Sequence, residues 1–103
     1  MLSKNDAIKY SKAFLKECDT LPVKINRAVL FGSSAKKGMK ENSDIDIAIF
    51  SDSFSNNILK NLDLIGKVAI KFPELDLHTF PSKSYKGDSL LIEEIKKTGI
   101  ELI

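Results

Sequence analysis

Two aspartates, Asp44 and Asp46, stand two residues apart in a segment rich in residues that favour β-strands. In an extended strand, residues two apart point to the same face, with their Cα atoms roughly 6.5 Å apart. We therefore expect both carboxylates on one face, with Ile45, Ile47 and Ile49 turned toward a core on the other. Paired carboxylates are costly unless a cation or hydrogen-bond donors compensate their charge, and Mg²⁺ prefers oxygen ligands. The spacing outlines a metal site, although two acids on the solvent face of a half-buried strand are also ordinary.

An apolar run upstream stops at Gly32 and Ser33, and the residues after it are compatible with a short helix through about Lys37. Free backbone N–H groups at a helix start bind phosphate favourably. Lys36, Lys37 and Lys40 lie between this turn and the acidic strand, where they would meet a triphosphate or an acidic partner, or else remain solvated in a loop. We predict nucleotide or phosphate binding by Gly32, Ser33 and Lys36.

Gly32-Ser33 followed by Asp44-Ile45-Asp46 resembles the signature of the DNA polymerase beta-like nucleotidyltransferase superfamily, in particular its small members, the minimal nucleotidyltransferases. The resemblance extends over nearly the whole chain and implies a single nucleotidyltransferase domain over residues 1–103. The family commonly has a glycine directly after the basic residue of its turn, whereas a second lysine comes first here. This difference bears on the geometry of the turn more than on the metal site.

Hydrophobic spacing predicts alternating helices and strands in the order α-β-α-β-α-β-α. Three longer helices are predicted at residues 5–18, 56–71 and 89–98, and a short helix is predicted from the turn at residue 32 through residue 37. The predicted strands cover residues 24–31, 43–50 and 74–80. The segment between the third strand and the last helix is predicted as a loop, and residues 100–103 as an edge strand or a contact with a partner. This order favours an α/β (α+β) domain with a small mixed sheet, helices packed on one face and the acidic face open.

The third predicted strand carries two polar side chains, Asp76 and His78, on the face opposite its leucines. From the residues alone, Asp76 is equally compatible with a solvated strand position, and His78 with a surface residue that has no metal or acid–base role. The resembled family has a third acid on the strand that follows its paired acids. If the two strands are neighbours, the resemblance implies a catalytic and metal-ligating triad of Asp44, Asp46 and Asp76.

The resemblance also implies a reaction and a partner. The reaction is the Mg²⁺-dependent transfer of a nucleoside monophosphate, AMP from ATP, to a hydroxyl acceptor, with two Mg²⁺ ions held by the triad. Minimal nucleotidyltransferases that resemble this chain are often paired with a helical HEPN-type ribonuclease toxin, which they neutralise, in some cases by adding AMP to a tyrosine of the toxin. The resemblance therefore implies an antitoxin whose partner is a HEPN-type toxin or another helical subunit.

Two alternatives remain open at this point. A catalytically silent subunit would bind a nucleotide at most and would neutralise its partner by forming a complex. A nucleotidyltransferase that modifies a small molecule, such as an aminoglycoside, is the less favoured alternative, because such enzymes usually carry an extra helical region that binds the acceptor.

The 103 residues carry a net charge of +2, with 43% hydrophobic and 29% charged residues. This composition is that of an ordinary globular domain, and the net charge is too small to indicate direct nucleic-acid binding. No apolar run approaches the roughly 20 residues of a membrane helix, and residues 1–12 lack the apolar core of a signal peptide, so we expect a cytoplasmic protein. The only cysteine, Cys18, is expected in the core.

Overall fold

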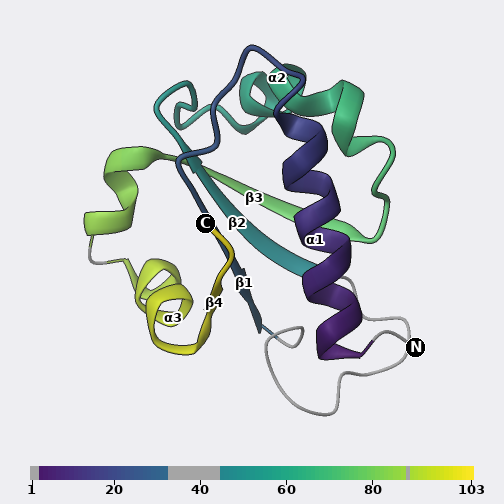
Figure 1. Ribbon diagram of the computed structural model, residues 1–103. Coiled ribbons are helices and arrows are strands. Elements are labelled where there is room, and N and C mark those ends of the chain that lie inside the picture. The colour runs from purple at the N-terminus through teal and green to yellow at the C-terminus, as the bar shows by residue number, and fades with distance from the viewer. Residues whose placement is uncertain (1–2, 33–44, 88) are drawn as a thin grey trace.

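The computed structural model describes residues 3–32, 45–87 and 89–103, and helices and strands alternate along the chain (Figure 1). In chain order the elements are α1 (Lys4–Cys18), β1 (Arg27–Phe31), β2 (Ile45–Ser51), α2 (Ile58–Ala69), β3 (Leu75–Pro81), the 3₁₀ helix η2 (Ser82–Lys86), α3 (Leu90–Thr98) and β4 (Ile100–Glu101). The structure confirms the three longer predicted helices to within two residues at each end. The short helix predicted through Lys37 lies outside the described residues.

The four strands form one sheet in the order β3-β2-β1-β4. β1 runs antiparallel to both β2 and β4, whereas β2 and β3 run parallel. Parallel neighbours need a crossover connection, and α2 lies in that connection here. The prediction of a small mixed sheet is therefore confirmed, and the third predicted strand does lie beside the second. Of the two expectations for the last residues, the edge strand is the one observed, as β4.

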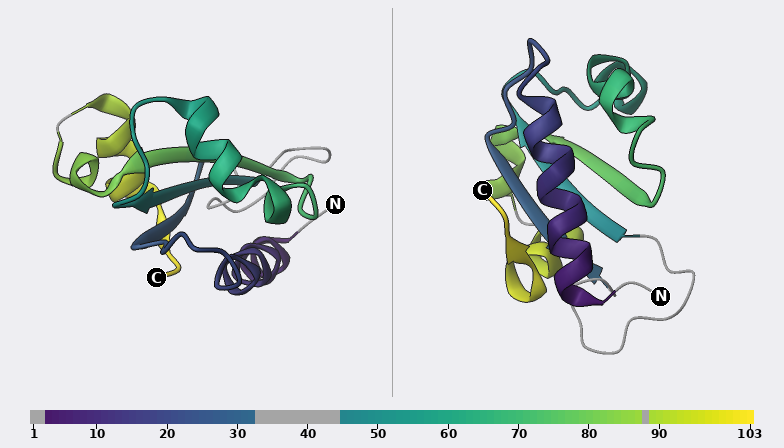
Figure 2. Two further views of the ribbon diagram at one scale, coloured as in Figure 1. Left: turned by 90° about the horizontal axis from the view of Figure 1, so that it is seen from above. Right: turned by 45° about the vertical axis from the view of Figure 1, so that its right-hand side comes forward.

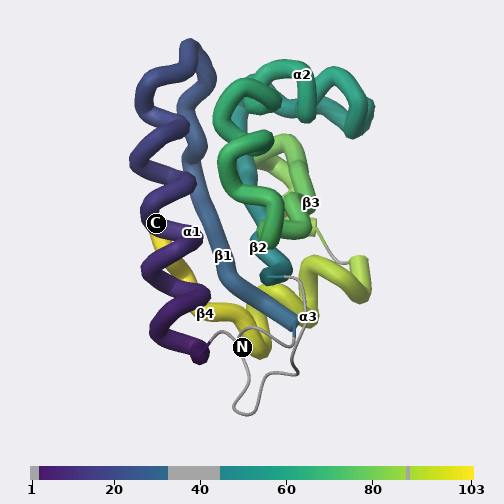
Figure 3. Tube along the Cα trace, turned by 90° about the vertical axis from the view of Figure 1, so that its right-hand side faces the viewer, coloured from purple at the N-terminus to yellow at the C-terminus, as the bar shows by residue number. Residues whose placement is uncertain are grey.

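α1 and α2 cover one face of the sheet and face the viewer in Figure 3. Phe14 and Cys18 of α1 and Ile65 of α2 form one buried cluster with Ile47 and Ile49 of β2. Burial of such side chains contributes about 1.5–3 kcal/mol each, which makes this cluster the main core of the domain. Cys18 is 2% exposed, as predicted for a core residue.

α3 packs against the opposite face of the sheet. Its Ile92 and Ile95 form a second cluster with Val29 of β1 and with Ala48 and Phe50 of β2. The left view of Figure 2 shows β1 and β4 between α1 and α3. The fold class is confirmed, but α3 is an exception to the expectation that the helices pack on one face. Helical periodicity gives α3 an apolar stripe without indicating which face of the sheet that stripe covers.

Polar side chains cap the starts of the three α-helices. Ser3 forms a capping box with Asp6, in which the Ser3 hydroxyl accepts from the Asp6 N–H and the Asp6 carboxylate accepts from the Ser3 N–H. Asn57 caps α2 by accepting from the Lys60 N–H, and Ser89 caps α3 in the same way. Within the part of the chain that the structure describes, no helix is both long and apolar enough to cross a membrane.

Two local features differ from the prediction. β1 begins three residues later than expected, since the Lys24 carbonyl accepts a hydrogen bond from the Ser51 hydroxyl at 2.6 Å. The predicted loop before α3 contains η2, whose Tyr85 ring packs edge-on against Phe50 and lies beneath the guanidinium of Arg27. Both differences arise from contacts between residues far apart in the sequence, which spacing within a segment does not reveal.

Candidate active site

β2 and β3 build the acidic face. They run parallel with Asp46 opposite Asp76 in the register. Because side chains alternate along a strand, the isoleucines of β2 turn toward α1 and α2, where Ile45, Ile47 and Ile49 are fully buried. The aspartates turn to the other face. The predicted placement of Asp46 and Asp76 opposite the isoleucines is thus confirmed. Farther along β2, however, the same face carries Ala48 and Phe50, which are buried in the cluster with α3, so this face is not open along its whole length.

Asp46, Asp76 and His78 form a cluster in which one donor atom from each lies within 4.8 Å of the others. Nε2 of His78 lies 3.4 Å from Oδ1 of Asp46 and 3.6 Å from Oδ2 of Asp76. The exposed fractions of the three side chains are 27% for Asp46, 53% for Asp76 and 31% for His78. Carboxylate oxygens and an imidazole nitrogen are metal ligands, so this partly exposed donor set fits a divalent cation.

Asp46 is the more enclosed of the two acids. Burial of its carboxyl group raises the pKa of Asp46; the hydrogen bond and charge of His78 oppose this effect, and the neighbouring Asp76 adds to it. A raised pKa means that the surroundings disfavour the ionised carboxylate. A bound cation would favour that ionised form, so the electrostatics of Asp46 also fit a metal ligand.

Gly32 closes the cluster on the side of β1. It follows the last residue of this strand and has a φ of 67°, a conformation that glycine adopts without strain. A Cβ atom at this position would meet Oδ2 of Asp46 at 2.6 Å, which is too short for a contact. Gly32 therefore leaves the space that the Asp46 carboxylate occupies. This packing role was not apparent from the sequence, which indicated only the turn.

His78 is the site residue that the sequence analysis did not assign. Its partner in the register is Ala48, a small buried residue on the same face of β2 as Asp46. The Phe31 ring packs edge-on against the imidazole, with the ring centroids 5.0 Å apart. The alternation of side chains along β3 predicted that His78 shares a face with Asp76. The contact of His78 with Asp46 depends on the parallel register of β2 and β3, which could not be predicted from the sequence.

The other predicted site residues, Ser33, Lys36 and Asp44, lie outside the described residues. Among the residues predicted to bind phosphate or metal, the structure brings together Gly32, Asp46 and Asp76.

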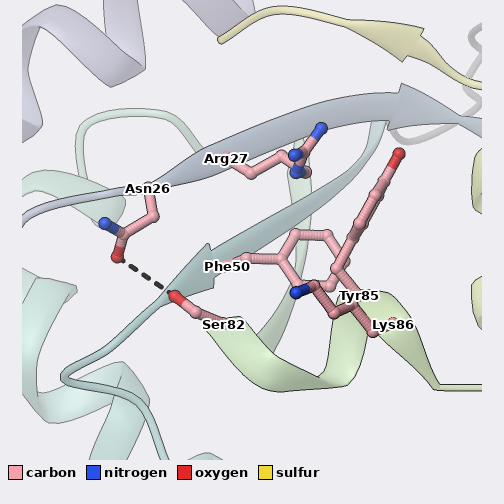
Figure 4. A pocket seen from close by; sticks show the side chains of 6 residues that line it. All are labelled: Asn26, Arg27, Phe50, Ser82, Tyr85 and Lys86. Atoms are coloured by element: carbon pink, nitrogen blue, oxygen red, sulfur yellow. Dashed lines mark hydrogen bonds between the residues drawn. The ribbon is translucent and has the colours of Figure 1, made fainter.

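A hollow of about 160 Å³ lies on the same face, where β2 ends and η2 begins (Figure 4). Its lining residues are Asn26, Arg27, Phe50, Ser82, Tyr85 and Lys86. The guanidinium of Arg27 lies 3.9 Å from the centroid of the Tyr85 ring and forms an ion pair with Glu101. Phe50 packs edge-on against Tyr85. Arg27 and the two aromatic rings of the hollow are thus already in contact within the protein.

Comparison with known proteins identifies the family of the chain. The model of the nucleotidyltransferase domain matches residues 11–101. Among solved structures, a chain in the crystal structure of a mutant of the toxin-antitoxin MntA-HpeT is similar, with a TM-score of 0.59 and 25% sequence identity over 99% of this chain and 73% of that chain. No curated protein sequence matches significantly. The family match covers most of the chain, agrees with the resemblance noted in its sequence and supports a nucleotidyltransferase activity, and the chain therefore belongs to the nucleotidyltransferase domain family.

Proposed function

We propose that this nucleotidyltransferase moves AMP from ATP to a hydroxyl group of a partner protein and depends on divalent metal ions. The observation that carries the proposal is the alignment of Asp46 and Asp76 on the parallel strands β2 and β3, with their donor atoms close enough to share one ion. Nucleotidyl transfer needs such a cation, because negative charge is spread over the phosphate oxygens in the transition state.

The three aspartates have the central roles in this proposal. Asp44, Asp46 and Asp76 hold two Mg²⁺ ions, which supply charge neutralisation at the triphosphate when they are bound. The acceptor oxygen attacks the α-phosphorus, the bond from this phosphorus to the bridging oxygen breaks, and pyrophosphate leaves. Asp76 is more exposed than Asp46. It is therefore better placed to meet an incoming acceptor, to orient its hydroxyl group and to take the proton that this group loses.

The turn after β1 is proposed to hold the leaving group. Gly32 and Ser33 bind the β- and γ-phosphates through backbone N–H groups and the serine hydroxyl, and Lys36 adds a positive charge. Gly32 ends β1 next to Asp46, as its close approach to the Asp46 carboxylate indicates. A phosphate bound at this turn would therefore lie beside the metal ligands, as transfer requires.

We propose a HEPN-type toxin as the partner and one of its tyrosines as the acceptor, which makes the chain an antitoxin. The similarity to a chain of the toxin-antitoxin MntA-HpeT supports this assignment. In this proposal the protein acts in the cytoplasm, and residues 1–103 form one nucleotidyltransferase domain.

One observation favours a second candidate, a silent subunit that neutralises its partner by binding alone. Nε2 of His78 lies near both carboxylates. The imidazole forms a hydrogen bond with the Asp46 carboxylate, so a contact within the chain holds these two groups together without a metal ion. The two candidates differ in whether any part of ATP becomes attached to the partner.

Incubation with ATP labelled on the α-phosphate, Mg²⁺ and the HEPN-type toxin proposed as the partner separates them. We expect the label on the toxin and the release of pyrophosphate, and mass spectrometry should place AMP on a tyrosine. The double variant Asp44→Asn/Asp46→Asn should lose the transfer and keep the fold. Asp63→Asn is the matched control, because Asp63 is an exposed residue of α2. Neutralisation of the toxin with no attached label would refute the transfer and support the silent subunit.

A further inference from the structure

Nε2 of His78 faces both described acids and forms a long hydrogen bond with Asp46, so it points to the place where the two carboxylates would share an ion. Strong N–H···O hydrogen bonds span about 2.7–3.2 Å. The separations from Nε2 to the nearer oxygens of Asp46 and Asp76 are longer, at 3.4 Å and 3.6 Å. Two donors on one ion with bonds of about 2.1 Å lie about 3.0 Å apart in octahedral and about 3.4 Å apart in tetrahedral coordination. Mn²⁺ and Mg²⁺ prefer octahedral coordination. The separations from Nε2 exceed the octahedral value by about 0.4 and 0.6 Å, and the three donors lie within 4.8 Å of one another, so a bound ion would draw them closer together.

The packing around the imidazole keeps it in this place. The methyl group of Ala48, opposite His78 on β2, leaves space beside the ring. Phe31 contacts the ring edge-on from β1, at an interplanar angle of 68°. Gly32, the next residue, gives the Asp46 carboxylate its space. Two neighbouring residues of one strand end therefore position a nitrogen and an oxygen donor of the same cluster.

We propose that His78 is a metal ligand and that the ion it shares with Asp46 and Asp76 is a first-row transition ion such as Mn²⁺, in preference to Mg²⁺. The proposal rests on the metal site of the proposed function and refines its metal. Mg²⁺ is held almost entirely by oxygen ligands, whereas imidazole suits transition ions. An ion that arrives with the triphosphate is bound mainly by phosphate oxygens, and its identity is not affected.

Affinity measurements on two variants test this preference. We expect His78→Ala to weaken Mn²⁺ binding at least about tenfold, because the loss of even an indirect ligand contact costs 10- to 100-fold, and to change Mg²⁺ binding by less than about twofold. Asp76→Asn replaces a charged carboxylate ligand with a neutral amide oxygen and should weaken both ions by similar factors. Calorimetric titration of each ion into the tag-free proteins gives the four ratios, and circular dichroism checks that the variants are folded.

A second measurement uses the wild-type protein and so does not depend on a variant folding. His78 is the only histidine of the chain, so every imidazole signal in a ¹⁵N NMR spectrum of the tag-free protein belongs to it. The only thiol does not compete for the ion, because burial raises the pKa of Cys18 to about 12. We expect Zn²⁺, used here as a diamagnetic probe, to shift the Nε2 resonance far more than the Nδ1 resonance.

The outcomes separate this inference from the proposed function. Equal losses of Mn²⁺ and Mg²⁺ affinity in His78→Ala, or an Nε2 resonance that Zn²⁺ leaves in place, would overturn the role of His78 while leaving the carboxylate site intact. If Asp76→Asn also left both affinities unchanged, the metal site of the proposed function would fail with it.

Discussion

The two ends of one sheet face differ in how their charges are compensated. At the end with Asp46 and Asp76, two acids face each other across parallel strands, and burial raises the pKa of Asp46. At the other end, the Arg27 guanidinium stacks on Tyr85 and pairs with Glu101, so opposite charges and a ring face are matched within the chain. The acidic end gains from an added cation, whereas the contacts of the hollow are complete without one.

This contrast indicates which groups contribute to the stability of the fold and which groups gain from binding a ligand. Contacts already made in the folded protein stabilise the fold, and groups held against their electrostatic preference gain from a ligand. We therefore expect changes at the acidic end to affect turnover and metal binding, and changes at the hollow to affect stability. Four predictions test this division, beginning with the largest effect.

Asp76→Asn should lower the transfer rate by at least about 10²-fold, because it removes a metal ligand and the proposed acceptor of the hydroxyl proton. Lys86→Ala, at the hollow, should leave the rate within about twofold. Single-turnover transfer of labelled AMP to the toxin measures both, and thermal unfolding should show that each variant is folded. Comparable losses of rate in the two variants would remove the functional distinction between the ends.

Gly32→Ala should destabilise the protein by about 1–2 kcal/mol, because alanine is strained at a φ of 67° and its Cβ would displace the Asp46 carboxylate. The metal affinity should fall as well, since Asp46 moves. Gly66→Ala is the control with the opposite sign: an added Cβ has no atom within 4 Å there, and in the interior of α2 it should stabilise by about 0.5–1 kcal/mol. Urea unfolding of both variants gives the two values, and a stable Gly32→Ala with unchanged metal binding would contradict the packing role of Gly32.

The elements that the sequence predicted well are those determined by local signals. α1 has its capping box at Ser3 and Asp6, and β2 and β3 have alternating faces, so their ends and orientations could be predicted. The pair of Asp46 and Asp76 needed one further fact, that β2 and β3 are neighbours. Residue spacing does not contain this fact, so the triad could be predicted only on the condition that the two strands are neighbours.

The unpredicted features all involve contacts between distant segments. η2 forms where Tyr85 meets Arg27, which is 58 positions earlier in the chain, and α3 covers the sheet face that had been expected to stay open. His78 is the most informative case. Its own strand placed it beside Asp76, but only the register across to Asp46 makes it a candidate ligand rather than a surface histidine.

Arg27→Gln tests the hollow. The substitution removes the ion pair with Glu101 and the stacking on Tyr85, and we expect a loss of about 0.5–1 kcal/mol of unfolding free energy, because both contacts are partly exposed. Lys83→Gln removes an exposed cation of η2 with no such contacts among the described residues and should be neutral. Urea unfolding measures both, and the transfer rate should stay unchanged in each. A slower transfer in Arg27→Gln at full stability would instead make the hollow part of the active site.

The smallest expected effect is the pH dependence that Asp46 contributes in the absence of metal. Its pKa is raised in the folded protein, chiefly by burial, so the folded state binds more protons than the unfolded state between the ordinary aspartate pKa and the raised value. Stability should therefore fall as the pH rises through this interval, and Asp46→Asn should be relatively more stable at pH 7 than at pH 3. The difference in melting temperature between the two proteins isolates Asp46, because their other carboxyl groups are the same.

Saturating Mn²⁺ should reverse this difference at pH 7 by stabilising the wild-type protein alone, since the ion favours the carboxylate that burial disfavours. A difference in melting temperature that is independent of both pH and metal would mean that the fold does not disfavour the ionised form of Asp46. The contrast between the two ends of the face would then not be electrostatic.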